Sequence, residues 1–244
     1  MKPYYERDGI TIFHGDCLEI LRCSRCNDTG IEADRIGLGY EVKCGACHTS
    51  NLGAPLILTD PPYGISHASN HTAPTTTAKW MNSTIQGDES VAARDAVLAK
   101  ATEWVCFGSP DIAPPPNADD VLIWDKGPAS GMGDLAWPWK RSWELVFVRG
   151  SRWSGRRDEG VLKNFHVVTR ASMGRVHPNE KPVSLMRHFI AKHDAEIILD
   201  PFMGSGTTLV AAKLEGRKAI GIEIEERYCE IAAKRLAQGV LAFP

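Results

Sequence analysis

One stretch, Leu56–Tyr63, limits the fold of this chain more than any other. Its first four residues, Leu-Ile-Leu-Thr, are apolar or β-branched, as is typical of a buried strand. The strand must end at Asp60, because the two prolines that follow cannot donate a ladder hydrogen bond and the residue before a proline is kept out of the helical region. Asp60 is therefore expected at the carboxyl end of a strand, the edge at which open α/β sheets bind ligands.

The side chains of this turn suit a flat ring that carries an exocyclic amine. Asp60 and the carbonyl of Pro61 can accept both hydrogens of such an amine, and Tyr63 can stack on the ring. The alternative is an ordinary proline turn with no chemical role.

A second strand and turn lie some 140 positions further along the chain. Glu196–Leu199 has the pattern of a strand that ends at Asp200, and a glycine-rich run, Pro201–Thr208, leads into a helix over Leu209–Leu214. Glycines at such a turn let a ligand approach the backbone, and the helix N-terminus favours a carboxylate. The following strand, Lys218–Glu223, ends in an acid about twenty residues on, where dinucleotide folds grip a ribose.

The remaining elements predict an α/β fold with a doubly wound, mostly parallel, Rossmann-like sheet. Strands alternate with helices along the chain, which places helices on the faces of a parallel sheet. The further strands are expected at 9–13, 104–107, 121–124 and 142–148, and the further helices at 17–22, 90–102, after Pro182 and at 224–238.

Composition narrows the classes of protein. The chain has 244 residues, 43% of them hydrophobic, which suits one α/β domain with an elaboration. The formal charge is −2, so any nucleic-acid contact must come from a local basic patch. No apolar run is long enough for a membrane helix and the N-terminus lacks a signal-peptide core, which predicts a cytoplasmic protein.

Four of the seven cysteines form two CxxC pairs, Cys23 with Cys26 and Cys44 with Cys47. The spacing is that of a four-cysteine ribbon, and we expect structural Zn²⁺ on these thiolates. A redox pair is the alternative, and His48 competes as a ligand. This module, residues 23–51, interrupts a catalytic domain made of 1–22 and 52–244.

A basic segment follows the strand at 142–148. Basic residues mixed with an aromatic suit phosphate contact together with base or sugar packing, although a solvated basic face is the alternative. We expect DNA contact from Arg149, Arg152, Trp153, Arg156 and Arg157. The last four lie within a short target-recognition segment expected at 150–176, and Arg149 immediately precedes it.

Several of these motifs in this order resemble one known family. DPPY at 60–63, HPNEKP at 177–182, DPFMGSGTT at 200–208 and GIEIEERY at 221–228 look like the β-arrangement, amino-group DNA methyltransferases that use S-adenosylmethionine. In that arrangement the catalytic half precedes the cofactor half. The cysteine module is not usual in the family core.

The resemblance assigns roles to individual positions. It implies that Asp60, Pro61, Pro62 and Tyr63 are catalytic. It places the methionine part of the cofactor at Asp200, Pro201, Phe202, Gly204, Ser205, Gly206 and Thr207, with Lys181 near the methionine carboxylate. Glu223 would hold the ribose, and Asp16 would lie by the adenine, unless Asp16 is simply a helix N-cap.

The resemblance also implies a substrate. In the family an Asp in the DPPY motif more often accompanies N6-adenine than N4-cytosine, so we expect site-specific N6-adenine methylation of double-stranded DNA. N4-cytosine methylation is the alternative, and a non-catalytic DNA-binding protein that keeps the fold is an alternative of another class. A homodimer and a cognate restriction nuclease are left open as partners.

Overall fold

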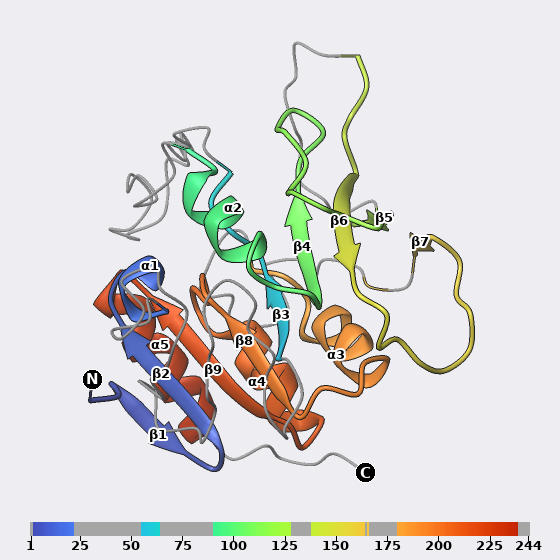
Figure 1. Cartoon of the computed structure of the whole chain (residues 1–244). Helices are drawn as coiled ribbons and strands as arrows, with labels where there is room; N and C mark the ends of the chain where they lie inside the picture. The colour runs from blue at the N-terminus through green and yellow to red at the C-terminus, as the bar shows by residue number, and fades with distance from the viewer. Residues whose placement is uncertain are drawn as a thin grey trace, which may run out of the picture.

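The computed structural model describes residues 2–21, 55–63, 90–127, 138–163, 165 and 180–238. Within these residues the chain forms one sheet of nine strands in the order β1-β2-β9-β8-β3-β4-β6-β5-β7 (Figure 1).

Five adjacent strands run parallel and form the centre of the sheet. They are β2 (Ile10–His14), β9 (Lys218–Glu223), β8 (Ile197–Asp200), β3 (Leu56–Thr59) and β4 (Trp104–Gly108). Their residues are almost entirely buried, as expected for strands with helices on both faces.

The outer strands break the parallel order. On one side β1 (Tyr5–Arg7) pairs antiparallel with β2. On the other side β6 (Trp143–Arg149) runs antiparallel to both β4 and β5 (Asp120–Asp125), and β7 (Val161–Leu162) lies parallel to β5. The prediction of a mostly parallel sheet is confirmed, but the strand expected at 142–148 runs against the central strands.

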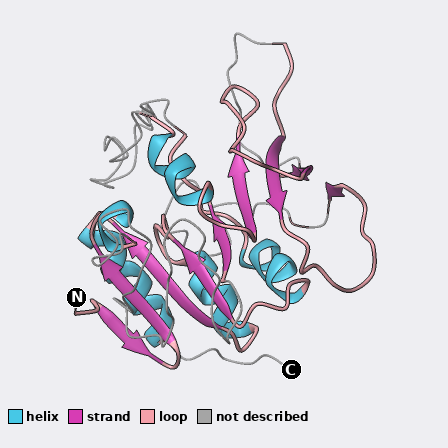
Figure 2. Cartoon of the chain, in the orientation of Figure 1, coloured by secondary structure: helices cyan, strands magenta, loops and turns pink. Residues whose placement is uncertain are grey.

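Helices cover both faces of the sheet (Figure 2). One face packs against α3 (Val183–Ala191), α4 (Thr207–Leu214) and α5 (Glu226–Ala237), and the other against α1 (Cys17–Ile20) and α2 (Ala92–Leu98).

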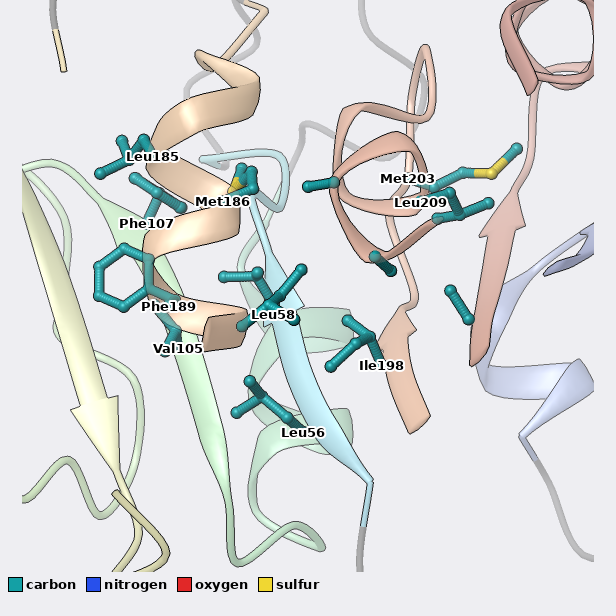
Figure 3. Close-up of a cluster of buried hydrophobic side chains, with 14 of the residues drawn as sticks. Leu56, Leu58, Val105, Phe107, Leu185, Met186, Phe189, Ile198, Met203 and Leu209 are labelled. Carbon is teal, nitrogen blue, oxygen red and sulfur yellow. The ribbon is translucent and has the colours of Figure 1, made fainter. Parts of the chain in front are cut away.

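The alternation of β3 explains the two cores. Leu56 and Leu58 face the helices α3 and α4, where they meet Met186 and Phe189 (Figure 3). Ile57 faces the opposite core. A strand apolar at every position can satisfy two hydrophobic layers at once.

The order of the strands places the site. From β3 the chain crosses through α2 to β4 on one side, and from β8 it crosses through α4 to β9 on the other. The winding therefore reverses between β3 and β8, and in open α/β sheets ligands bind at the carboxyl ends of the strands at such a switch point.

Two expectations lie wholly or partly outside the described residues. These are the cysteine module at 23–51 and the part of the recognition segment after 163, apart from residue 165. In the described part of the chain, no helix combines the length and apolarity required to span a membrane.

Candidate active site

The two predicted motifs meet at the switch point. Leu56 and Ile57 of β3 pair in parallel with Ile198 and Leu199 of β8, so the turns after these strands are neighbours. The hydroxyl of Thr59 donates a 2.7 Å hydrogen bond to Oδ1 of Asp200. Asp60 therefore directly follows a residue that is hydrogen-bonded to Asp200, the last residue of β8 before the glycine-rich turn.

Four polar side chains form a cluster at the carboxyl edge of β3. The Tyr63 hydroxyl lies 2.9 Å from Oδ1 of Asp60 and also contacts Oε1 of Glu144. The ammonium of Lys181 lies 2.6 Å from Oδ2 of Asp60 and 2.9 Å from Oε1 of Glu144. Lys126 reaches the other oxygen of Glu144 at 3.5 Å.

Burial and charge act against each other in this cluster. Burial raises the pKa of Asp60, and Glu144 adds to this, although Lys181 opposes the rise. Burial would also raise the pKa of Glu144, but the ammonium groups of Lys181 and Lys126 outweigh it and the pKa falls below its usual value. Glu144 is therefore the more strongly acidic of the two carboxyls.

Asp60 is the most accessible of the three charged groups. Its side chain is 25% exposed, compared with 11% for Glu144 and 7% for Lys181. Asp60 can therefore receive a hydrogen-bond donor from outside, whereas Glu144 lies behind it.

The glycine-rich turn has a backbone shape that depends on Gly206. This residue has φ +81° at the start of α4, and a Cβ there would lie 2.7 Å from the Cβ of Ala232 in α5. An L side chain is disfavoured on both counts, so the glycine allows the turn to sit against α5.

Arg235 of α5 holds the same turn through hydrogen bonds to Ser205. Its guanidinium donates to the carbonyl and the hydroxyl of Ser205 at 2.8 and 2.9 Å, and it pairs with Glu180 at 2.5 Å. Thr207 also bonds to Glu180, at 3.3 Å. The residue next to Lys181 is thus tied to the turn expected to hold the cofactor.

Glu223 ends β9 beside this turn. Its carboxylate accepts hydrogen bonds from the backbone amides of Gly204 and Glu225, at 2.9 and 2.8 Å. Burial nevertheless raises its pKa to about 7. Asp16 lies at the adjacent strand end, since His14 pairs with Glu223. Its carboxylate caps α1 through the amide of Leu18, at 2.7 Å.

Asp200 is turned into the protein. It is 3% exposed, accepts from Thr59 and from the amide of Phe202, and has a pKa that burial raises to about 6. Through these hydrogen bonds Asp200 connects the strand before Asp60 with the glycine-rich turn. Lys181, expected near a methionine carboxylate, instead meets two carboxylates of the protein.

The structure does not bring the predicted DNA-binding residues to the cluster. Because β6 is antiparallel, Glu144 lies near its start at the catalytic edge, and Arg149 ends it opposite Trp104, at the amino edge of β4. The two residues are five steps apart along the strand, about 17 Å at the usual rise. The basic segment therefore begins at the edge of the sheet opposite the catalytic cluster.

Contacts within the basic segment attach part of it to the body of the protein. Arg152 pairs with Asp194 at 2.7 Å, and the Trp153 ring packs edge-on to His193 at 4.7 Å between centroids. The Trp153 ring therefore packs on the body of the protein, and its contact with DNA stays a prediction. Arg156 and Arg157 are exposed, and their contact with DNA stays a prediction.

The zinc prediction cannot be compared with this structure, because Cys23, Cys26, Cys44 and Cys47 lie outside the described residues. Among the residues that are described, no group of three or more His, Cys, Asp or Glu side chains could hold a metal ion.

Sequence reasoning missed Glu144, Thr59 and Arg235. Glu144 left a signal, because it shares its strand face with Val146 and so places a carboxylate among buried residues. Thr59 and Arg235 carry no comparable signal, since their partners are 141 and 30 positions away.

Comparisons with known proteins agree on one class. The DNA methylase family N6_N4_Mtase matches residues 114–234. Over 294 aligned residues the chain is 25% identical to the Type II methyltransferase M.ScaI of Streptomyces caespitosus, covering 96% of this chain and 84% of that protein. It is 49% identical to the Type II methyltransferase M2.LlaDCHI of Lactococcus lactis subsp. cremoris, but over 65 residues, about a quarter of each protein.

Solved structures share the fold. The structure described as the M1.HpyAVI-SAM complex aligns with a TM-score of 0.59 at 21% identity, covering 93% of this chain and 99% of the other. The PvuII DNA methyltransferase, described as cytosine-N4-specific, aligns with a TM-score of 0.57 at 17% identity, covering 99% and 91%.

Proposed function

We propose that this chain, which belongs to the N6/N4 DNA methyltransferase family, transfers a methyl group from S-adenosylmethionine to the N6 amine of adenine in double-stranded DNA. Membership of the family makes it a DNA-methylating enzyme. The choice of adenine, the residue roles and the permuted β-arrangement are our proposals.

One observation supports the residue roles above all others. The hydrogen bond between Thr59 and Asp200 holds the Asp60 turn and the glycine-rich turn side by side at the switch point, although 141 positions separate the bonded residues. A methyl donor on one turn and an amine on the other can then meet without a large movement, and most of the acceleration comes from positioning.

The chemistry at Asp60 is hydrogen bonding to the amine. An exocyclic amine is a weak nucleophile because its lone pair is delocalised into the ring. Hydrogen bonds to Asp60 and to the Pro61 carbonyl favour a tetrahedral nitrogen, whose lone pair attacks the methyl carbon in line. The N–C bond would form as the S–C bond breaks, with the thioether as leaving group, and the proton that the nitrogen then loses would pass to solvent water. Tyr63 would stack on the base once it has left the duplex.

On the cofactor side, Gly204, Ser205, Gly206 and Thr207 would receive the methionine part with the helix N-terminus of α4 behind them. Glu223 would accept hydrogen bonds from the ribose hydroxyls, with Asp16 near the adenine. Pro201 and Phe202 complete this turn after β8, and Pro62 stiffens the catalytic turn.

The choice between adenine and cytosine rests on Asp60. The fold alone does not decide it, since a structure described as cytosine-N4-specific shares that fold. We prefer adenine because this motif carries Asp, where Ser is commoner among the N4-cytosine enzymes.

The test is methyl transfer from labelled S-adenosylmethionine to duplex DNA, followed by digestion to nucleosides. We expect labelled N6-methyl-2′-deoxyadenosine. Labelled N4-methyl-2′-deoxycytidine would overturn the choice of adenine, and DNA without label would overturn the proposed activity. Asp60→Ala should abolish transfer while S-adenosylmethionine still binds in calorimetry; an active variant would refute the role of Asp60.

A further inference from the structure

In the catalytic cluster, the hydroxyl of Tyr63 has two hydrogen-bond acceptors beside it but only one proton to donate. A phenol has one proton to donate, yet the Tyr63 oxygen contacts two carboxylates, Asp60 at 2.9 Å and Glu144 at shorter range. Only one of them can accept that proton at a time. Because the Tyr63 hydroxyl already contacts Oε1 of Glu144, this second carboxylate offers it an alternative acceptor to Asp60.

Each oxygen of Asp60 already has one hydrogen-bond donor as the cluster stands. Lys181 lies at Oδ2 and Tyr63 at Oδ1. An arriving amine needs one of these oxygens, and Oδ1 is released if the Tyr63 proton turns wholly to Glu144. No side chain has to leave its place for this exchange, because both contacts already exist.

Glu144 also balances the charge of Lys181. The ammonium lies between the two carboxylates, 2.6 Å from Asp60 and 2.9 Å from Glu144. Without Glu144 it would pair with Asp60 alone, and a fully paired carboxylate is a weaker acceptor for a neutral amine. With Glu144 present, Asp60 keeps part of its negative charge for the substrate.

We propose that Glu144 is a positioning residue for the methyl transfer, which takes up the Tyr63 hydroxyl and shares Lys181 so that Oδ1 of Asp60 is free to accept a hydrogen bond when the amine arrives. This inference rests on the proposed function. Glu144 acts through Tyr63 and Lys181 and needs no contact with the base.

The experiment compares Glu144→Gln with the wild-type enzyme and with Glu159→Gln, a matched change at an exposed carboxylate that pairs with Lys163 in an i,i+4 bridge. We expect Glu144→Gln to lower kcat about a hundredfold, the effect typical of a misplaced reacting group. The affinity for S-adenosylmethionine and the melting temperature should stay close to wild type, and Glu159→Gln should change none of these values.

The pH profile gives a readout that a merely structural role would not move. The ionisable groups near Asp60 are Lys181, Tyr63, Glu144, Asp200 and Cys106. Because Glu144 raises the pKa of Asp60, removing its charge should move the acid limb of kcat/KM to lower pH. An unshifted limb together with wild-type kcat would overturn the proposal.

A double-mutant cycle tests the route through Tyr63. Tyr63→Phe keeps the ring but removes the hydroxyl that needs a second acceptor. Glu144→Gln should therefore cost several-fold less in the Tyr63→Phe background than in the wild type, whereas equal costs would refute the exchange. If Glu144→Gln does not fold, Glu144→Asp keeps the charge; it should leave the acid limb in place while lowering kcat, and a shifted limb would overturn the proposal.

The outcomes separate this inference from the proposed function. A wild-type enzyme that transfers no methyl group to DNA refutes the function itself. An active wild type with an equally active Glu144→Gln refutes only the role of Glu144.

Discussion

Thr59 donates its hydroxyl to Oδ1 of Asp200 at 2.7 Å, and this bond joins the strand that carries Asp60 to the turn after β8. Both partners are buried, with Thr59 fully hidden and Asp200 3% exposed. The bond thus connects two segments of the chain that are distant in sequence, next to the turns that form the proposed reaction centre.

Thr59→Val should therefore reduce both stability and activity. Valine has the same shape but no donor, so a buried carboxylate loses a partner, at a cost of about 1–3 kcal/mol in the free energy of unfolding. Urea unfolding measures this cost, and Thr59→Ser should recover most of it. A Thr59→Val protein as stable as the wild type would show that the bond contributes nothing.

Glu223 predicts a pH dependence of cofactor binding. Burial raises its pKa to about 7, so the carboxyl is neutral below that pH and ionised above it. Only the ionised form accepts both ribose hydroxyls, so affinity for S-adenosylmethionine should fall as the pH drops through about 7. Calorimetry between pH 6 and 8.5 measures the slope, and Glu223→Gln should bind more weakly with a flat profile. A wild-type affinity that is independent of pH would contradict the ribose role.

Local patterns in the sequence predict the central strands well. The apolar run at β3 and the proline pair after it leave one outcome, a buried strand with an acid at its end. The same holds for β8, where the structure starts α4 at Thr207 rather than at Leu209, because Gly206 already supports the first turn. These features are local, and so they can be recognised without the fold.

Strand direction and long-range contacts, by contrast, cannot be predicted from local sequence patterns. The sequence of residues 143–149 does not indicate that β6 runs antiparallel to β4. That direction nevertheless places Glu144 at the reaction centre and Arg149 at the opposite edge of the sheet. Likewise β7 has two residues and depends on its pairing with β5. Such features are set by packing between distant segments, which periodicity does not encode.

The zinc module yields a prediction about metal content. If Cys23, Cys26, Cys44 and Cys47 hold one Zn²⁺, purified protein should contain about one equivalent. Cys44→Ser should lower this content and the melting temperature, because metal binding to such sites is coupled to folding. Cys17→Ala, at a buried cysteine of α1, should leave the zinc content unchanged. Protein that carries well below one equivalent, with a Cys44→Ser variant that folds normally, would refute the module.

Arg235 predicts a separate effect on cofactor binding. Its guanidinium supports the turn through Ser205 and reaches Glu180, the neighbour of Lys181. Hydrogen bonds from a charged group are worth about 1.5–3 kcal/mol each, so a turn that loses this support should bind S-adenosylmethionine at least about tenfold more weakly. Calorimetry on Arg235→Ala measures the loss, and Arg235→Lys should recover only part of it, because an ammonium lacks the planar fork.

A matched arginine separates this effect from general instability. Arg217 also donates to backbone carbonyls, those of His193 and Ala195, but at the amino edge of the sheet. Arg217→Ala should lower the melting temperature while leaving the affinity for S-adenosylmethionine unchanged. If both variants weaken binding in proportion to their loss of stability, Arg235 supports the fold in general and has no specific role at the cofactor turn.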